Sequence, residues 1–128
     1  MNKDFQVYVI GGIIKTDVLA SSGVFATEFL ANFYHIDYAI ISCDGFIPDK
    51  GTTEYSIELS MLKKVVLEKT GKINVIADHS KMGIAGSSLC CPIHKISIVV
   101  VDSETAEAHI NTMRMHGLEV VIAAPAEA

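Results

Sequence analysis

The sequence lacks both an apolar run long enough to cross a membrane and an excess of basic residues. Its densest apolar runs, at residues 7–14, 38–43 and 96–101, are far shorter than the roughly 18 residues that a membrane-spanning helix needs. Residues 1–4 are not followed by an apolar segment with a small-residue cleavage site, so we expect no signal peptide. The 15 acidic residues outnumber the 10 lysines and arginines, which argues against a nucleic-acid-binding surface. We therefore expect a cytoplasmic protein that contacts neither a membrane nor, directly, DNA.

Cysteine is scarce, and its spacing argues against disulfides and metal sites. The three cysteines are Cys43, Cys90 and Cys91, an odd number in which two are adjacent and none forms a CxxC pair. None of the five histidines is spaced for metal binding with a second histidine or a cysteine. Cys43 lies inside an apolar run, where a thiol is usually inert. The sequence predicts three reduced thiols and neither a metal nor another cofactor.

Hydrophobic residues, in contrast, make up 50% of the 128 residues, and the mean hydropathy is +0.39. This content excludes a disordered chain, and the length fits one domain of roughly 100–200 residues. The apolar residues are concentrated in short runs rich in valine and isoleucine, which are typical of parallel strands covered on both faces. The high hydropathy therefore indicates an α/β protein.

Expected strands and helices alternate along the chain. Apolar residues recur with helical spacing near residues 25–33, where Phe25, Phe29 and Phe33 share a face, and also at residues 54–69 and 104–115. Ser103 is the expected cap of the last helix. The expected strands are residues 5–10, 38–43, 73–77, 96–101 and 118–122, and the expected loops include residues 48–53 and 83–92. This alternation predicts a mostly parallel, Rossmann-like sheet flanked by helices.

Polar residues follow the expected strands where ligands bind in open α/β sheets, outside the carboxyl ends. The most informative segment is residues 78–83, in which Asp78, Ser80 and Lys81 provide an acceptor, a hydroxyl and a cation directly after a buried strand. Such a group can hold a hydroxylated, phosphorylated ligand, with Lys81 as a point charge for phosphate. The alternative is an exposed polar turn with an internal aspartate–lysine pair.

Small residues lie at other strand ends. The paired residues Gly11-Gly12 and Ser22-Gly23 could let the backbone approach a phosphate, or could form two ordinary turns. Asp44-Gly45 could bind sugar hydroxyls or begin a loop. Gly51-Thr52 supplies N–H and hydroxyl groups before a helix, where it could also serve only as a cap.

Together, residues 37–46, the triplet at 51–53 and residues 77–83 resemble the effector-binding domain of DeoR-type transcriptional repressors. Gly11-Gly12 and Ser22-Gly23 before the first helix, and Asp102 after a valine-rich run, occur in the same order as the corresponding motifs of that family. The resemblance implies a sheet related to ribose-5-phosphate isomerase, glucosamine-6-phosphate deaminase and CoA-transferase-like folds, and a phosphorylated sugar as effector. It implies that Asp78 and Lys81 contact the phosphate. The full set of implied ligand-binding residues is Gly11, Gly12, Ser22, Gly23, Asp44, Gly45, Gly51, Thr52, Asp78, Ser80 and Lys81.

The chain departs from the family pattern in three ways. Ile10 stands where threonine is usual, and Ser22 stands where an apolar residue is usual. The family's helix-turn-helix domain and the first part of its effector domain have no counterpart in the chain. We therefore expect residues 1–128 to form a single, truncated effector-binding domain that assembles as a homo-oligomer. It would bind effector weakly or not at all, and it would reach DNA only through a helix-turn-helix domain absent from this chain.

The main alternative is an enzyme, an aldose–ketose isomerase of phosphosugars with the related fold. Asp44, Asp78 or Glu54 could be its base, and Lys81 could stabilise the developing oxyanion. No second carboxylate is evident close to Asp78, so we expect sensing rather than catalysis. A receiver-like module is disfavoured, because Gly11-Gly12 stands where an acidic pair is required.

Overall fold

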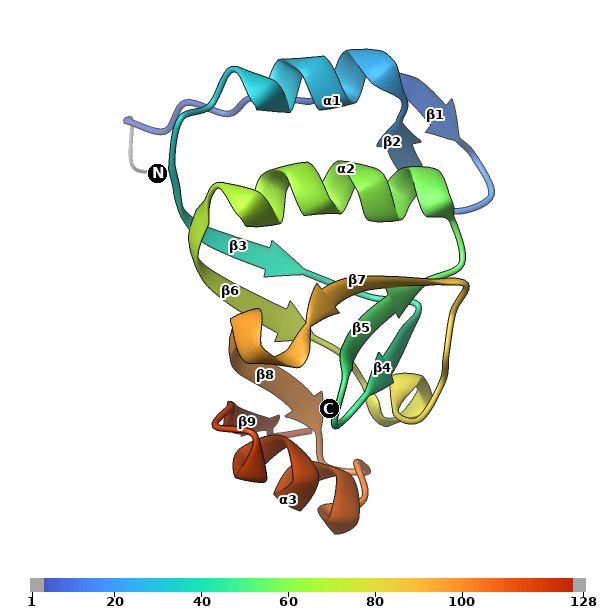
Figure 1. Cartoon of the computed structure of the whole chain (residues 1–128), viewed down its shortest axis with the longest axis vertical. Helices are drawn as coiled ribbons and strands as arrows, with labels where there is room; N and C mark the ends of the chain where they lie inside the picture. Colours follow the sequence, from blue (N-terminus) through green and yellow to red (C-terminus); the bar gives the residue numbers. More distant parts are fainter. Residues whose placement is uncertain (1–3, 126–128) are drawn as a thin grey trace.

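A four-stranded parallel sheet forms the centre of the computed structural model, which describes residues 4–125. Its strands are β3 (Ile36–Ile41), β6 (Thr70–Ile76), β8 (Ile96–Asp102) and β9 (Glu119–Ala123), in the order β3-β6-β8-β9. All three strand pairs are parallel, as Figure 1 shows. Four of the five predicted strands therefore form the predicted parallel sheet, and the α/β class is confirmed.

Helices cover one face of this sheet. The longest, α2 (Ile57–Glu68), packs against β3 and β6, and α1 (Val24–Ala31) packs on α2, while α3 (Glu107–Met115) packs on β9 (Figure 1). The core beneath them is apolar: Val75 and Val99 of the sheet and Met113 of α3 are fully buried. The other face is more open, because Tyr38 and Ile40, which alternate with buried Ala39, are 62% and 70% exposed.

A second, three-stranded sheet occupies segments for which the sequence predicts loops. It consists of β4 (Gly45–Ile47), β5 (Gly51–Glu54) and β7 (Ser88–Pro92), paired antiparallel. The loop prediction for residues 48–53 and 83–92 is therefore wrong in part. These strands are short and carry glycine, threonine and cysteine instead of a regular apolar pattern, so periodicity gives no signal. The strand β5 also takes up Glu54, and α2 begins only after its cap, Ser56.

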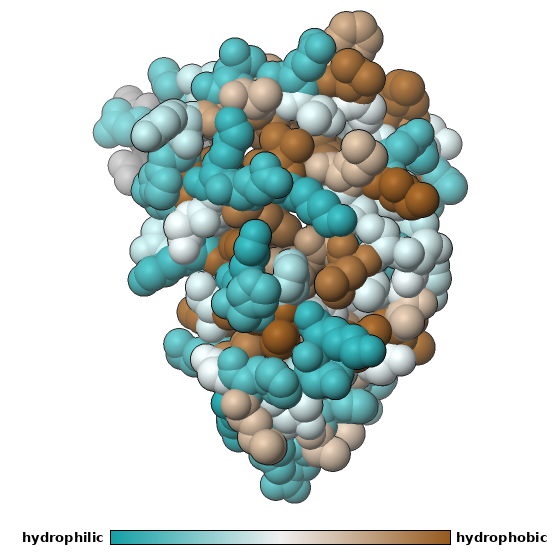
Figure 2. Space-filling view, viewed as in Figure 1, coloured by the Kyte–Doolittle hydropathy of each residue, from teal (hydrophilic) through white to brown (hydrophobic). Residues whose placement is uncertain are grey.

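The N-terminal part differs most from expectation. Residues 5–10 form no strand, and Phe5, Val7 and Val9 are about 80% exposed or more. An apolar run becomes a strand only where a neighbouring strand offers backbone hydrogen bonds, and this run has none among the described residues. Instead β1 (Ile13–Lys15) and β2 (Ala20–Ser22) form a hairpin before α1. Figure 2 shows apolar surface over this end of the molecule.

The helix α1 does not bury the predicted phenylalanine face. Its buried residues are Ala26 and Leu30, and Phe25 is 77% exposed. Phe29 and Phe33 instead form an aromatic cluster with Tyr8 of the N-terminal run. The ring centroids of Phe29 and Phe33 are 5.8 Å apart. The spacing of the phenylalanines therefore predicts the helix correctly, but it does not predict which residues pack against that face of the helix.

The C-terminal helix also begins later than predicted. Its N-cap is Ala106 instead of Ser103, because residues 102–105 form a turn in which the Thr105 hydroxyl donates to Asp102 (2.8 Å). Met113 is buried and Met115 is 86% exposed. Two short 3-10 helices, η1 (His79–Lys81) and η2 (Ile93–Lys95), precede β7 and β8 respectively. Within the described residues, none of the helices has the length and apolar content needed to span a bilayer.

Candidate functional site

A tight turn at residues 78–81, called here the 78–81 turn, follows β6 at the carboxyl edge of the parallel sheet. Asp78 caps η1: its Oδ1 accepts the Ser80 backbone N–H (2.9 Å) and the Ser80 hydroxyl. These bonds lower the pKa of the exposed Asp78 carboxyl. The side chains of Asp78 and Ser80 are thus fixed to each other, and the carboxylate stays charged at neutral pH.

The cation of this turn has no ionic partner. The Lys81 backbone N–H donates to the Asp78 carbonyl (3.1 Å), but no acidic group of residues 4–125 lies within 4.0 Å of Lys81 Nζ. The internal Asp78–Lys81 ion pair, which was the alternative reading of this segment, does not form.

Backbone contacts join this turn to the start of the small sheet. The Gly83 N–H donates to the Phe46 carbonyl (2.8 Å), and Thr53 Oγ1 accepts the Gly86 N–H (2.8 Å). The contact is close at Gly45, where a Cβ atom would lie 2.1 Å from the Ile84 carbonyl oxygen. Asp44, Gly45 and Lys81 therefore belong to neighbouring segments at this edge, as the resemblance implies.

Two other residues of the predicted set are packing residues. Gly51 has a φ of +130°, and a Cβ atom there would lie 2.0 Å from the Cys91 carbonyl oxygen. Thr52 is fully buried, and its Oγ1 accepts the Cys91 N–H (3.0 Å). Both hold β5 against β7, so a ligand has no access to the hydroxyl of Thr52.

A cavity of about 340 Å³ lies beside Asp44, between the β1–β2 connection, the end of β3 and the start of α2. Its size suits a small ligand, since binding cavities span roughly 300–1,000 Å³. It is lined by Lys15, Val18, Leu19, Ala20, Ser42, Cys43, Asp44, Glu54, Ser56, Leu59 and Lys63. Asp44 accepts the Tyr55 backbone N–H through Oδ2 (2.8 Å), and its carboxylate lies close enough to Glu54 to help raise the pKa of that carboxyl.

The most buried charges of this cavity belong to Glu54 and Lys63, and of these two the sequence predicts a role only for Glu54, as a possible base. Lys63 Nζ lies 2.5 Å from Glu54 Oε1 and donates to the Ser42 carbonyl (2.7 Å). The Glu54 side chain is only 3% exposed, and burial raises its pKa, although Lys63 opposes this shift. The two residues lie on a strand and a helix that meet only in the folded chain, so their spacing carries no motif.

The predicted residues of the N-terminal part do not line this cavity. A Cβ atom on Gly12 would lie 2.5 Å from the Ser22 carbonyl oxygen, and Ser22 is 2% exposed. Gly23 precedes α1, and its carbonyl accepts the Thr27 hydroxyl (3.1 Å). Gly12, Ser22 and Gly23 shape the hairpin that places Lys15 and Ala20 at the cavity, whereas Gly11 is exposed.

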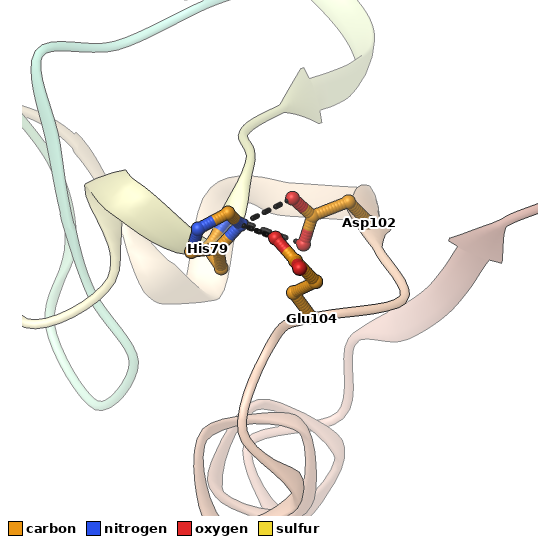
Figure 3. A group of neighbouring side chains, drawn as sticks. All are labelled: His79, Asp102 and Glu104. Carbon is orange, nitrogen blue, oxygen red and sulfur yellow. Dashed lines mark hydrogen bonds and ion pairs between the residues drawn. The ribbon is translucent and has the colours of Figure 1, made fainter. Parts of the chain in front are cut away.

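A cluster of His79, Asp102 and Glu104 adjoins the turn (Figure 3). The His79 Nδ1 lies 2.5 Å from Asp102 Oδ2 and 3.4 Å from Glu104 Oε2. The bond to Asp102 raises the pKa of His79 and lowers that of Asp102 to about 2. The ligand atoms of the three side chains lie within 4.8 Å of one another, but existing hydrogen bonds explain the arrangement and we assign no metal to it.

The cysteines are structural. All three are buried and unpaired, and burial raises the pKa of Cys43 to about 12 and that of Cys91 to about 11. A thiol with such a pKa is almost entirely protonated at neutral pH and is a poor nucleophile. The burial and raised pKa of Cys43 agree with the prediction that this thiol is inert.

Comparison with known proteins identifies the family. The sequence model of the DeoR C terminal sensor domain matches residues 1–103. The HTH-type transcriptional regulator GolR of Listeria innocua is 27% identical over 95% of this chain, which covers 48% of GolR. The HTH-type transcriptional repressor GlcR of Bacillus subtilis is 25% identical over 91% of the chain and 45% of GlcR. The glycerol-3-phosphate regulon repressor of Escherichia coli is 19% identical over 94% of the chain and 47% of that repressor. The chain thus spans about half the length of these relatives, and it belongs to the DeoR C-terminal sensor domain family.

Proposed function

We propose that this chain is a sugar-phosphate-sensing domain of a DeoR-type repressor of carbohydrate utilisation. The observation that carries the proposal is Lys81, a cation at the carboxyl edge of the sheet without an ionic partner among the described residues. A phosphate monoester is an anion and would supply the ionic partner for the Lys81 ammonium group. One curated relative is named as a repressor of the glycerol-3-phosphate regulon, which fits a phosphorylated effector.

The neighbouring groups suit the rest of such a ligand. The carboxylate of Asp44 lines the cavity, where it could accept a sugar hydroxyl, and the cavity holds further polar groups such as Ser42 and Ser56. A ligand with an anionic end at Lys81 and hydroxyls toward Asp44 would engage both segments that the small sheet joins. A neutral sugar would leave Lys81 unpaired, which favours the phosphorylated form.

Sensing is favoured over catalysis by the electrostatics of the carboxylates. An isomerase needs a base whose pKa lies near the working pH. The pKa of Asp78 is lowered, so Asp78 is a weak base. The pKa of Glu54 is raised, but its side chain is only 3% exposed and its carboxylate is bonded to Lys63, so it is poorly placed to reach a substrate. We therefore keep the isomerase only as the alternative, to be decided by an assay of turnover.

The named relatives are helix-turn-helix regulators. We propose that residues 1–128 sense the effector and that DNA is reached through a helix-turn-helix domain, in a cytoplasmic homo-oligomer. An effector would act by binding one arrangement of that oligomer more tightly than the other.

The test is a nuclear magnetic resonance titration of the isotope-labelled chain with a panel of aldose and ketose monophosphates. We expect weak binding, with a Kd in the millimolar range, and shifts of the amides of Gly45, Ser80 and Lys81. The unphosphorylated sugars and inorganic phosphate serve as ligand controls. Lys81→Met should abolish the shifts, whereas Lys64→Met, at an exposed position of α2, should retain them. Equal binding by Lys81→Met, or no response to any phosphosugar, would refute the proposal.

A further inference from the structure

Asp102 contacts the 78–81 turn at two points. Its Oδ1 accepts the His79 backbone N–H (3.2 Å), and its Oδ2 lies 2.5 Å from the His79 ring Nδ1. The ring contact is drawn in Figure 3, where the carboxylate of Asp102 faces the imidazole. One carboxylate therefore fixes both the backbone and the side chain of the residue between Asp78 and Ser80.

The carboxylate is itself anchored to the sheet. Asp102 is the last residue of β8, and its Oδ1 also accepts the hydroxyl of Thr105, which is 6% exposed. The strand next to it, β6, leads directly into the turn, and the Ala77 N–H donates to the Val100 carbonyl (3.0 Å). Asp102 thus connects the turn to a rigid strand end, which is how outer residues orient the groups that touch a ligand.

We propose that Asp102 is a positioning residue for the effector site: by holding His79, it sets the orientation of Asp78, Ser80 and Lys81. This inference rests on the proposed function, because it assigns Asp102 to the same site. Asp102 need not touch the ligand. Its effect passes through His79, whose backbone lies between the cap residue Asp78 and the hydroxyl of Ser80.

If Asp102 positions the site through His79, the affinity for an anionic ligand should depend on pH. The titratable groups around the His79 ring are Asp102, Glu104, Asp78 and, on the same turn, Lys81. The bond to Asp102 raises the pKa of His79, so the ring is cationic to a higher pH than a free histidine. A cationic ring offsets nearby carboxylates and favours an anionic ligand at Lys81. Affinity should therefore fall as the pH rises through the pKa of His79.

The test compares Asp102→Asn with Glu104→Gln in the phosphosugar titration, over a range of pH. Asparagine keeps the size of Asp102 but removes the charge, so we expect a loss of affinity on the order of tenfold. The midpoint of the pH-dependent fall should also move to lower pH, because the His79 ring loses its ionic partner. The Glu104 side chain is 75% exposed, and its one ion pair among residues 4–125 is with the His79 ring, so its variant should stay close to wild type in affinity. The titration of the phosphate is common to all variants and cancels in the comparison.

Two further measurements separate the possible failures. The amide spectrum and thermal unfolding of Asp102→Asn show whether it retains the fold, and the His79 ring proton is titrated without ligand. Wild-type affinity and an unchanged pH midpoint in Asp102→Asn would overturn the positioning role and leave the proposed function standing. If the wild-type chain binds no phosphosugar, the proposed function fails and the positioning role fails with it. A raised His79 pKa that falls in Asp102→Asn would then show that the contact exists but serves only the local structure.

Discussion

Removal of the Lys63 amine should destabilise the fold in a way that depends on pH. In Lys63→Met, the carboxylate of Glu54 loses its partner while its side chain stays 3% exposed. An uncompensated buried charge typically costs about 3–5 kcal/mol when one member of a buried pair is removed. The carboxyl can avoid this penalty by taking up a proton, which sets an upper limit to the loss.

That limit follows from the ordinary pKa of the group. Protonating a carboxyl with a pKa of 4.5 requires about 3 kcal/mol at about pH 7 and less than about 1 kcal/mol at about pH 5. The free energy of unfolding of Lys63→Met should therefore fall by about 2–3 kcal/mol at about pH 7, and by much less at about pH 5. The sign follows because a folded-state pKa above the unfolded value destabilises the fold above that unfolded value, and the effect disappears below it.

Urea unfolding of the wild type and the variant at the two pH values measures this directly. Lys64→Met is the matched control, since Lys63 lines the cavity and Lys64 is exposed on the same helix. The double variant Glu54→Gln/Lys63→Met should recover part of the loss, because no buried charge remains. A loss below about 1 kcal/mol at neutral pH, or a loss that persists unchanged at the lower pH, would refute this reasoning.

Three further predictions concern backbone packing, thiol reactivity and self-association. Gly45→Ala should lower the free energy of unfolding by more than about 2 kcal/mol, because its Cβ atom would lie 2.1 Å from the Ile84 carbonyl oxygen, whereas Gly11→Ala, with no atom within 4 Å, should be nearly neutral in urea unfolding. Cys43 should resist alkylation in the native chain and react only on unfolding, because its pKa is about 12; rapid labelling of the folded protein would contradict this. Ile40→Lys should reduce concentration-dependent association in light scattering while changing stability little, because Ile40 is 70% exposed on the edge strand β3; unchanged association would show that this face is not involved.

The sequence predicts the parallel sheet well because its strands carry their own signal. The run that contains Val99 and Val101 is apolar at nearly every position, and both residues are fully or almost fully buried. Residues 5–10 carry a similar run but form no strand. The difference lies outside the run, since a strand also needs a partner edge, and local composition contains no information about that partner.

The small antiparallel sheet and much of the candidate site could not be predicted in the same way. Thr52 and Gly51 look like ligand contacts in the sequence, because glycine and threonine before a helix often bind phosphate. In the fold they are buried against Cys91. A small residue allows either a ligand or another backbone segment to approach closely. Only the tertiary structure shows which of the two lies next to it.

The charges of the site divide in a manner that the sequence does not reveal. Lys15 lies 2.9 Å from Glu58 and Lys63 lies 2.5 Å from Glu54, so two of the lysines at or near the cavity are already compensated. Among the described residues Lys81 has no such partner, and the turn that carries it is held by Asp78 from within and by Asp102 from the sheet. If the proposed function is right, the phosphate should therefore bind at Lys81 and not at Lys15 or Lys63, because the charges of those two lysines are already balanced by carboxylates.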